Sequence, residues 1–437
     1  MSASEESTDC VSLAIRTRDT SGCHDHELFV FIASDYKPRP GGIAEYIDNL
    51  ARGLINLGSK TKLLAVVQPH KKERIAFLEK YEDWVIPFQM VYDERPENWL
   101  GNKCVSLLEI ARCLSPNARR LLERTSLFRA SANAIARLDQ VLTRAKPSII
   151  VFGHLDSRHY PLALFLLERQ LPYGIIAHGF EIYRFPNKIN DHVRKGLMLK
   201  GAKWIAVNSR YTKSLVEMWG IPSTRIRIVH PPIGEGAIRG SGKLESISKR
   251  EDELNLVTIC RLVKIKGIDI VMRALKLLDA RGIPYRYVIG GEGTERRFLE
   301  ALADELGLRN RVHFMGYITG DDKWCLLRNS DVFVMPSRAE AKMEYEGFGI
   351  AFVEAAAFGL PGVGTREGGI PDAVVDGETG ILVPQESPES LAEALTFLYR
   401  NPDKRKDMGR AARERARRQF SPTAIAANFH EEISKTT

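Results

Sequence analysis

The chain has 437 residues, of which 44% are hydrophobic and 27% charged, and its formal net charge is +8. This length predicts two or three globular domains, and two large α/β domains fit it. No apolar run reaches the ~18–20 residues of a membrane-spanning helix, and we expect no secretory signal because the first residues are acidic and polar. The mild basic bias favours an anionic ligand or an anionic membrane face as partner, and we expect no nucleic acid.

The six cysteines are expected to be reduced thiols, because no pair has the spacing of a metal site or a redox motif. We therefore expect a cytoplasmic protein, either free or peripheral on the inner face of the membrane, with no metal and no bound cofactor. The cysteines are Cys10, Cys23, Cys104, Cys113, Cys260 and Cys325.

Residues 1–25 predict a disordered tail, because they are polar and lack hydrophobic periodicity. His24 and His26 lie beside Cys23 in this tail. We interpret these histidines as incidental, which is the usual case in such tails.

Residues 26–233 predict the first α/β domain. The apolar run at 27–34 is typical of a buried parallel strand, and the loop after it contains the pair Gly41-Gly42. A helical pattern over 43–57 and a second apolar run continue a doubly wound sheet. The glycine pair lacks the G-x-G-x-x-G spacing, so a plain tight turn explains it equally well.

The segment from Lys103 to Lys146 is helical in pattern and basic. Nine lysines and arginines stand against three acidic residues, with leucines and isoleucines between them. Two interpretations stay open: a helix pair lying on an anionic membrane face, and an ordinary solvent-exposed helical face. The basic residues are Lys103, Arg112, Arg119, Arg120, Arg124, Arg129, Arg137, Arg144 and Lys146.

Two later apolar runs each lead into a histidine, His154 and His178. Active groups in such sheets lie at the carboxyl ends of the strands, so both positions favour a site. Residues 234–253 are rich in glycine, serine and charge and predict a linker.

Residues 254–420 predict a second α/β domain, with helices expected over 268–280 and 295–306. The pair Asp321-Asp322 precedes a predicted helix, and we interpret it as capping rather than as a metal site. Residues 421–437 predict a last helix that crosses back to the first domain, since a serine and a proline there match an N-cap and a first helical position.

The helix predicted for 350–358 is apolar on every face, with Glu354 as its only charge. Gly359 and Pro361 end it. A carboxylate among apolar neighbours is costly unless a polar group meets it. The free N–H groups and the dipole at the helix N-terminus favour an anion such as a diphosphate. The alternative is a purely structural helix whose glutamate caps a neighbouring loop.

Two cations and two carboxylates near this helix fit a sugar joined to a nucleoside through a diphosphate. Arg261 and Lys266 lie in the loop after the first strand of the second domain, where they can hold two phosphates. Glu346 can accept hydrogen bonds from sugar hydroxyls, and Glu354 from a second diol such as ribose. Each residue type is common in loops, so it is their combination at strand ends that favours a site.

These motifs resemble those of the retaining glycosyltransferases of family 4, which have the GT-B fold. The resemblance covers nearly everything from about Glu27 onward and looks closest to bacterial phosphatidylinositol mannoside mannosyltransferases and their relatives. It implies an α/β fold of two Rossmann-like domains that face each other across a cleft. The motifs are the E-x7-E pair Glu346/Glu354, R-L-x-x-x-K-G from Arg261 to Gly267, G-G-I-P-D from Gly368 to Asp372, G-G-E-G from Gly290 to Gly293, H-G-F-E from His178 to Glu181, and P-R-P-G-G-I-A-E-Y.

The resemblance implies a role for each matching residue. The implied catalytic group is His178, Glu346, Arg261 and Lys266. The implied donor-binding residues are Arg261, Lys266 and Glu346 together with Gly41, Gly42, Met315, Tyr317, Ile318, Phe348, Gly349, Ile350 and Glu354. In this scheme the two cations bind the diphosphate, Glu346 holds the donor sugar, Glu354 holds the ribose, and the nucleobase lies near 315–318.

The resemblance implies a retaining, metal-independent transfer of a hexosyl unit to a hydroxyl group. The implied donor is a nucleoside-diphosphate sugar, either GDP-mannose or a UDP-hexose. The implied acceptor is a glycolipid, a polysaccharide or a small molecule. The alternatives are a non-catalytic nucleotide-sugar-binding protein and a sugar-nucleotide epimerase or phosphorylase on the same fold. One departure is H-P-P-I-G at His230 to Gly234, where many members have P-N-G-V-D. A second departure from the family pattern is a charged loop at 338–345. This loop is interpreted either as a flap or as an inert insertion.

Overall fold

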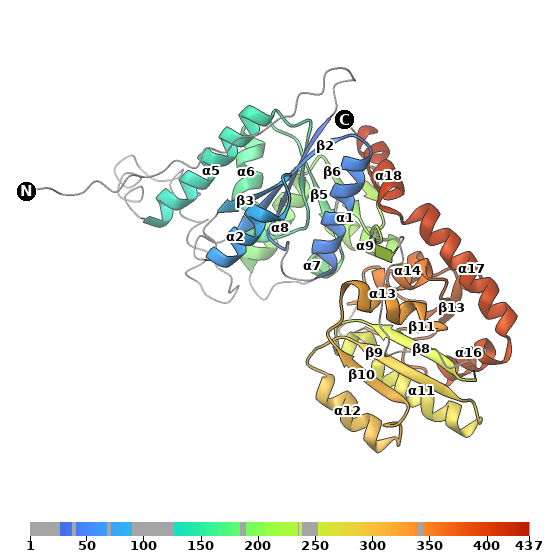
Figure 1. Cartoon of the computed structure of the whole chain (residues 1–437). Helices are drawn as coiled ribbons and strands as arrows, with labels where there is room; N and C mark the ends of the chain where they lie inside the picture. Colours follow the sequence, from blue (N-terminus) through green and yellow to red (C-terminus); the bar gives the residue numbers. More distant parts are fainter. Residues whose placement is uncertain are drawn as a thin grey trace, which may run out of the picture.

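The computed structural model describes residues 27–36, 41–67, 71–89, 126–183, 189–234, 236–237, 252–339 and 344–436. Two α/β domains, each built on a parallel sheet, make up these residues (Figure 1). Within the described ranges, no helix is long and apolar enough to cross a membrane. The predicted tail and most of the predicted linker lie outside the described residues.

The first domain contains a seven-stranded sheet in the order β3-β2-β1-β4-β5-β6-β7. The order reverses between β1 and β4, where Phe29 pairs with Ile149, and ligands of such sheets bind at this reversal. The strands are β1 (Leu28–Ala33), β2 (Lys60–Val67), β3 (Val85–Gln89), β4 (Ile149–Phe152), β5 (Tyr173–Ala177), β6 (Trp204–Val207) and β7 (Ile226–Ile228). The helices are α1 (Gly42–Asn56), α2 (Lys72–Tyr81), α5 (Ser126–Ala145), α6 (Tyr160–Glu168), α7 (Phe180–Tyr183), α8 (Ile189–Gly201) and α9 (Arg210–Glu217).

The second domain contains a six-stranded sheet in the order β10-β9-β8-β11-β12-β13. Its strands are β8 (Leu254–Ile259), β9 (Tyr285–Gly290), β10 (Val312–Gly316), β11 (Val332–Val334), β12 (Gly362–Thr365) and β13 (Gly380–Val383). Its helices are α11 (Ile268–Ala280), α12 (Arg296–Glu305), α13 (Gly320–Arg328), α14 (Ile350–Ala357), α15 (Ile370–Ala373), α16 (Pro388–Arg400) and α17 (Pro402–Gln419). Continuous apolar strands buried on both faces produce this helix-covered parallel arrangement in both domains.

The last helix, α18 (Pro422–Ser434), packs against α1 of the first domain, at the end of the long helix α17 (Figure 1). Its N-cap is Ser421, whose hydroxyl accepts a hydrogen bond of 3.3 Å from the Ala424 N–H, as the sequence predicts. Gly53 permits the close approach of the two helices, because a Cβ there would lie 2.3 Å from the Pro422 carbonyl oxygen. The Phe429 ring then covers Phe29 of β1 at 6.1 Å.

Most helix predictions agree with the structure, and one interpretation is wrong. The predicted helix 268–280 is α11, and the helix predicted for 350–358 ends one residue early. Asp321 and Asp322 do not cap α13: the helix begins at Gly320 after Thr319, so both acidic residues lie inside its first turn and favour it through the dipole alone. Of the basic segment, residues 103–125 lie outside the described residues, residues 126–145 form α5, and Lys146 follows the helix.

Candidate functional site

Lys266 and Glu346, predicted to contact a phosphate and a sugar, form an ion pair. Lys266 ends a 3-10 turn that follows β8, and Gly267 turns the chain with a φ of +67°. A Cβ at Gly267 would lie 2.1 Å from the Pro336 carbonyl oxygen, so the loop can approach the end of β11 only with glycine there. The side chains of the pair are 14% and 18% exposed, which leaves an edge of each open to a ligand.

Arg261 lies on the same loop with an exposed side chain. Its neighbour Cys260 is half-buried, and burial raises the pKa of this thiol to about 12, with Lys266 and Arg261 opposing that effect. The thiol is therefore neutral at physiological pH and adds no negative charge beside Arg261 and Lys266. The loop keeps two positive charges for an anion to meet.

Helix α14 begins beside this loop, at Gly349, which has a φ of +84° and provides no side-chain cap. No side chain therefore caps the first N–H groups of the helix. Ile350 is the first helical residue, and Phe348, 2% exposed, anchors the turn in the core. This local geometry explains the spacing of the motif: the turn between Glu346 and α14 needs a left-handed residue, which glycine supplies.

The glycine before Phe348 brings the two domains together. A Cβ at Gly347 would lie 2.3 Å from the carbonyl oxygen of His178, which directly follows β5 in the first domain. Glu346 and His178 therefore lie on opposite sides of one close contact. The structure thus places the ion pair of Lys266 and Glu346 beside the backbone of His178, and Arg261 lies on the same loop as Lys266.

His178 is held as a neutral imidazole. Its Nε2–H donates to the Gly153 carbonyl oxygen at 2.9 Å, and the edge of the ring meets Tyr46 at 4.9 Å between centroids. Burial lowers the pKa of His178, with Glu181 opposing that effect. With Nε2 as the donor, the neutral ring leaves Nδ1 as an acceptor for a hydroxyl.

Glu354 is almost completely buried and pairs with Lys323, whose Nζ donates to Oε1 at 2.6 Å. This is the polar partner that the sequence predicts a buried carboxylate to need, but the sequence did not identify it. Lys323 lies in the first turn of α13, 31 residues away along the chain. In the sequence, Lys323 is only a lysine beside Trp324 in the helix that follows β10. A lysine in such a position does not by itself indicate a buried ion pair.

The predicted nucleobase region lies at the end of β10. Met315 and Tyr317 are 38% and 58% exposed, as side chains available to stack on a planar ligand are. Ile318 instead packs inward: a Cβ at Gly290 would lie 2.3 Å from its Cδ1. Gly41 precedes α1 as its N-cap and Gly42 begins that helix, and no atom of the described residues would lie within 4 Å of a Cβ at either glycine.

A seam of polar contacts joins the domains next to Gly347. The Ser209 hydroxyl donates to the Gly347 carbonyl oxygen at 2.6 Å. The Arg210 N–H and its Nε both donate to the Asp372 carboxylate at 2.6 Å, so the last residue of G-G-I-P-D meets the N-terminus of α9. His230, from the departing H-P-P-I-G segment, stacks on Phe348 at 5.3 Å and donates from Nδ1 to the Asn208 carbonyl oxygen.

The charged loop that begins at Arg338 is anchored at its start. Arg338 is buried and pairs with Asp269 and Glu386. This part of the loop is therefore not a free flap, and residues 340–343 lie outside the described residues.

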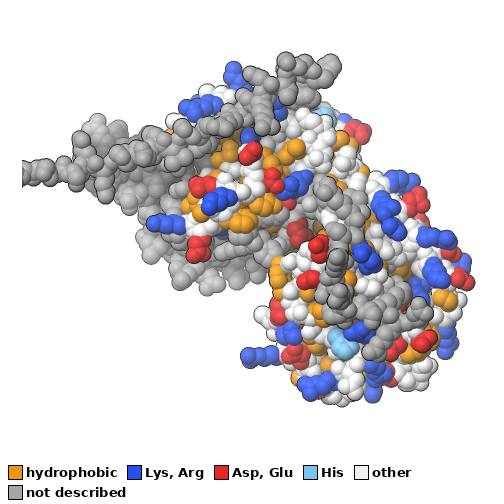
Figure 2. All heavy atoms as spheres, in the orientation of Figure 1, with side chains coloured by type: hydrophobic (Ala, Val, Ile, Leu, Met, Phe, Trp, Pro, Cys, Tyr) orange, Lys and Arg blue, Asp and Glu red, His pale blue; other side chains and the backbone are white. Residues whose placement is uncertain are grey.

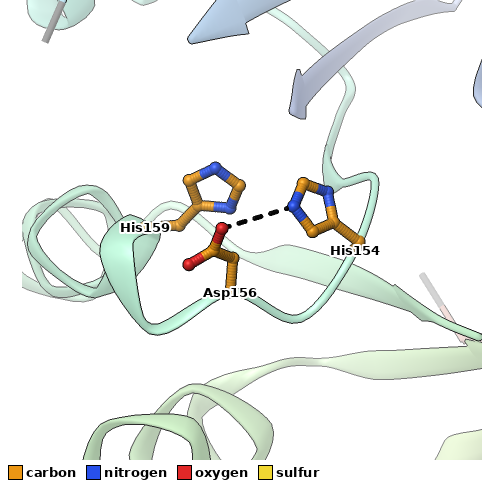
Figure 3. A group of neighbouring side chains, drawn as sticks. All are labelled: His154, Asp156 and His159. Atoms are coloured by element: carbon orange, nitrogen blue, oxygen red, sulfur yellow. Dashed lines mark ion pairs between the residues drawn. The ribbon is translucent and has the colours of Figure 1, made fainter. Parts of the chain in front are cut away.

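A second polar cluster, formed by His154, Asp156 and His159, follows β4 (Figure 3). The sequence predicted a site position only for His154. Both Asp156 oxygens already accept hydrogen bonds from Arg158, and Ser34 adds one at 2.9 Å. Despite burial, Arg158 holds the pKa of Asp156 well below its usual range, and burial lowers the pKa of His159 to about 3. The Arg158 guanidinium therefore already neutralises the Asp156 carboxylate, which a metal ion would need as a ligand. The cluster is an ion pair of a buried aspartate with a partly exposed arginine, flanked by two buried histidines.

Comparisons with known proteins agree with this geometry. The family model for glycosyl transferases group 1 matches residues 243–415, and the model for glycosyltransferase family 4 matches residues 40–234. The GDP-mannose-dependent alpha-(1-6)-phosphatidylinositol monomannoside mannosyltransferase of Mycolicibacterium smegmatis is 33% identical over 88% of this chain and 92% of its own length. The D-rhamnosyltransferase WbpZ of Pseudomonas aeruginosa is 37% identical, over 36% of this chain and 39% of its own.

Other matches are partial in sequence or in structure alone. WcaL of Salmonella typhimurium, described as a colanic acid biosynthesis glycosyltransferase, is 32% identical over 39% of this chain, which spans only 43% of the length of WcaL. HepE of Anabaena, solved with UDP and glucose, superposes with a TM-score of 0.67 at 19% identity, over 94% of this chain and all of HepE. At that identity the likeness concerns the fold. The two family models cover both domains, one relative matches along nearly its whole length, and the two-domain fold is shared. The chain therefore belongs to the family 4 glycosyltransferases of the GT-B fold.

Proposed function

We propose that the chain transfers a hexosyl unit from a nucleoside-diphosphate sugar to an acceptor hydroxyl with retention of anomeric configuration. GDP-mannose and a UDP-hexose are the candidate donors, and a glycolipid, a polysaccharide or a small molecule is the acceptor. The observation that carries the proposal is the Lys266–Glu346 pair at the start of α14, in contact through Gly347 with the His178 backbone. The M. smegmatis relative supports GDP-mannose by its name, and the HepE complex supports a UDP-sugar.

In the proposed reaction the bond between the anomeric carbon and the diphosphate oxygen breaks, and the acceptor oxygen attacks from the same face. The departing diphosphate takes the acceptor proton. Arg261, Lys266 and the N–H groups at the start of α14 stabilise the negative charge that grows on the diphosphate. Glu346 and the Nδ1 acceptor of His178 hold hydroxyls of the transferred sugar, and the contact between the domains excludes competing water.

A screen of nucleotide sugars for thermal stabilisation, followed by product analysis, tests the proposal. We expect one donor to raise the melting temperature most and to be consumed in the presence of an acceptor extract. The anomeric coupling constant of the product should match that of the donor. Stabilisation without any product would favour the non-catalytic binding protein, and conversion of the free donor to another nucleotide sugar would favour the epimerase.

We further propose that the acceptor binds the first domain and that, if it is lipid-linked, the basic segment at 103–146 contacts anionic headgroups, each basic residue contributing about 1 kcal/mol. The face of the second domain shown in Figure 2 carries both acidic and basic side chains. Salt-sensitive flotation with anionic vesicles should weaken when Arg119, Arg120 and Arg124 are changed to glutamate. A protein that stays unbound at low salt would refute the membrane contact while leaving sugar transfer intact.

A further inference from the structure

We propose that Lys323 is a positioning residue of the donor site, which holds Glu354 as a carboxylate for the ribose and couples it to Glu45 of the other domain. The inference rests on the proposed function, because it takes a nucleoside diphosphate as the ligand. Neither the motifs nor the matched families assign a role to Lys323 or to Glu45.

The first step is the environment of Glu354. The residue lies in the second turn of α14, whose other residues are all apolar. Its side chain is 4% exposed and that of Lys323 is 14% exposed, so neither charge is well solvated. The bond from Lys323 uses Oε1, and among the described residues Oε2 has no donor, which leaves it for a ribose hydroxyl.

The second step is the protonation state that binding needs. An ionised carboxylate only accepts hydrogen bonds and can take both hydroxyl donors of a diol, whereas the protonated acid must place a donor of its own. Burial raises the pKa of Glu354, Lys323 lowers it, and Glu45 raises it. The net pKa of Glu354 is raised, and Lys323, 2.6 Å from Oε1, is the group that opposes burial and favours the ionised form.

The third step is the position of Glu45 in the first turn of α1, on the first domain. Helices α1 and α13 meet at Gly234, where a Cβ would lie 3.8 Å from Trp324 and 3.9 Å from Asn49. Glu45 lies one turn before Asn49, and Lys323 directly precedes Trp324, so both charged residues lie close to this point of the domain boundary.

The charges on the two sides of this boundary act on each other. Burial alone would lower the pKa of Lys323, but Glu354, then Glu45 and more weakly Tyr317 outweigh it, and the pKa of Lys323 is raised. Lys323 therefore stays charged between two carboxylates from different domains. The ionisation of the ribose-binding carboxylate consequently depends on a residue that reaches it only when the domains are together.

The test measures the affinity of UDP and of GDP by calorimetry across about pH 5 to 8, without divalent metal. Lys323→Met should bind the preferred nucleotide about 10- to 100-fold more weakly at pH 7, the range expected for loss of a hydrogen-bonded charge. Nucleotide affinity should fall at acidic pH, where Glu354 becomes protonated. In Lys323→Met this fall should occur at a higher pH, because the pKa of Glu354 rises. Lys323→Arg should restore the wild-type profile, and Lys276→Met, an exposed lysine on α11, is the matched control.

Glu45→Gln gives a prediction of opposite sign. Glu45 raises the pKa of Glu354, so its removal should lower that pKa. The pH at which nucleotide affinity falls should therefore be lower than in the wild type. A purely structural role for either residue would not shift the two profiles in opposite directions. This variant also tests the proposal if Lys323→Met does not fold.

Wild-type profiles in both Lys323→Met and Glu45→Gln would overturn the inference while leaving the proposed function intact. A wild-type protein that binds neither UDP nor GDP at any pH would overturn both. A shift that persists in the Glu354→Gln background would also overturn the inference, because the carboxylate is then no longer the titrating group.

Discussion

Replacement of Lys266 by alanine tests the core of the proposed chemistry. The ammonium group lies against Glu346 on a glycine-backed turn and is only 14% exposed. Removing one positioned donor to a developing oxyanion costs about 3–4 kcal/mol, and about 1.4 kcal/mol corresponds to a tenfold change in rate. We therefore expect kcat to fall by roughly 100- to 1,000-fold.

The same change leaves Glu346 without its partner. Because that carboxylate is 18% exposed, its lost pairing should lower the free energy of unfolding by about 1–3 kcal/mol, which a thermal melt will show as a lower midpoint with a folded baseline. Activity is therefore measured well below the melting temperature of the variant, with product followed by chromatography at saturating donor.

Lys264→Ala is the matched control for this experiment. Lys264 lies on the same 3-10 turn, but its side chain is exposed. A surface change of this kind usually alters stability by less than about 0.5 kcal/mol, so the control should keep near wild-type turnover and melting. If Lys266→Ala were as active as Lys264→Ala, the assignment of Lys266 to the diphosphate would be wrong.

Three further predictions follow from the charges of the structure. In the proposed reaction, organic cations and a helix N-terminus stabilise the diphosphate, so turnover should persist in excess EDTA. A strict need for magnesium or manganese at the chemical step would contradict this mechanism. Asp372→Asn should lower kcat/KM more than Arg210→Ala does. The alanine variant loses only a 69% exposed guanidinium, and its backbone N–H still donates to the Asp372 carboxylate. Equal effects of the two changes would show that this backbone hydrogen bond is unimportant. The folded pKa of His159 is about 3 against 6.5 when unfolded, so its neutral burial costs stability as pH falls below 6.5. His159→Leu should reduce the pH slope of the unfolding free energy between about pH 6 and 4 by up to about 1.4 kcal/mol per pH unit, measured by urea titration, and an unchanged slope would refute neutral burial.

The sequence predicted those features that local patterns determine. Apolar runs predicted the strands, and glycine with proline predicted the end of α14 almost to the residue. The spacing of the glutamates was also informative, because one turn of chain with a left-handed glycine separates Glu346 from the helix that carries Glu354. Asp321 and Asp322 show the limit of such patterns: a one-residue shift in the start of α13 changes a cap into a first-turn residue.

Contacts between segments far apart in the chain could not be predicted in this way. The pattern at His230 looked like a loss of a family contact, yet the ring stacks on Phe348 and so takes part in joining the domains. Lys323 is an ordinary helical lysine until α14 places a buried carboxylate 2.6 Å from its ammonium group. The sequence predicted the need of Glu354 for a partner, because burying a lone charge is costly, but the identity of that partner depends on how α13 packs against α14.

The same dependence explains why the site lies at the boundary between two domains. His178 belongs to one sheet and Glu346 to the other, and Gly347 is the point at which their backbones touch. A side chain there would separate the domains, because its Cβ would lie 2.3 Å from the His178 carbonyl oxygen. Gly347→Ala should therefore lower turnover without disturbing either sheet. The hydrogen bond from Ser209 to the Gly347 carbonyl oxygen, 2.6 Å long, holds the same contact from the other side. In the proposed reaction, glycine at this position is a requirement of the geometry, since Glu346 and His178 would act on one sugar only with the backbones this close.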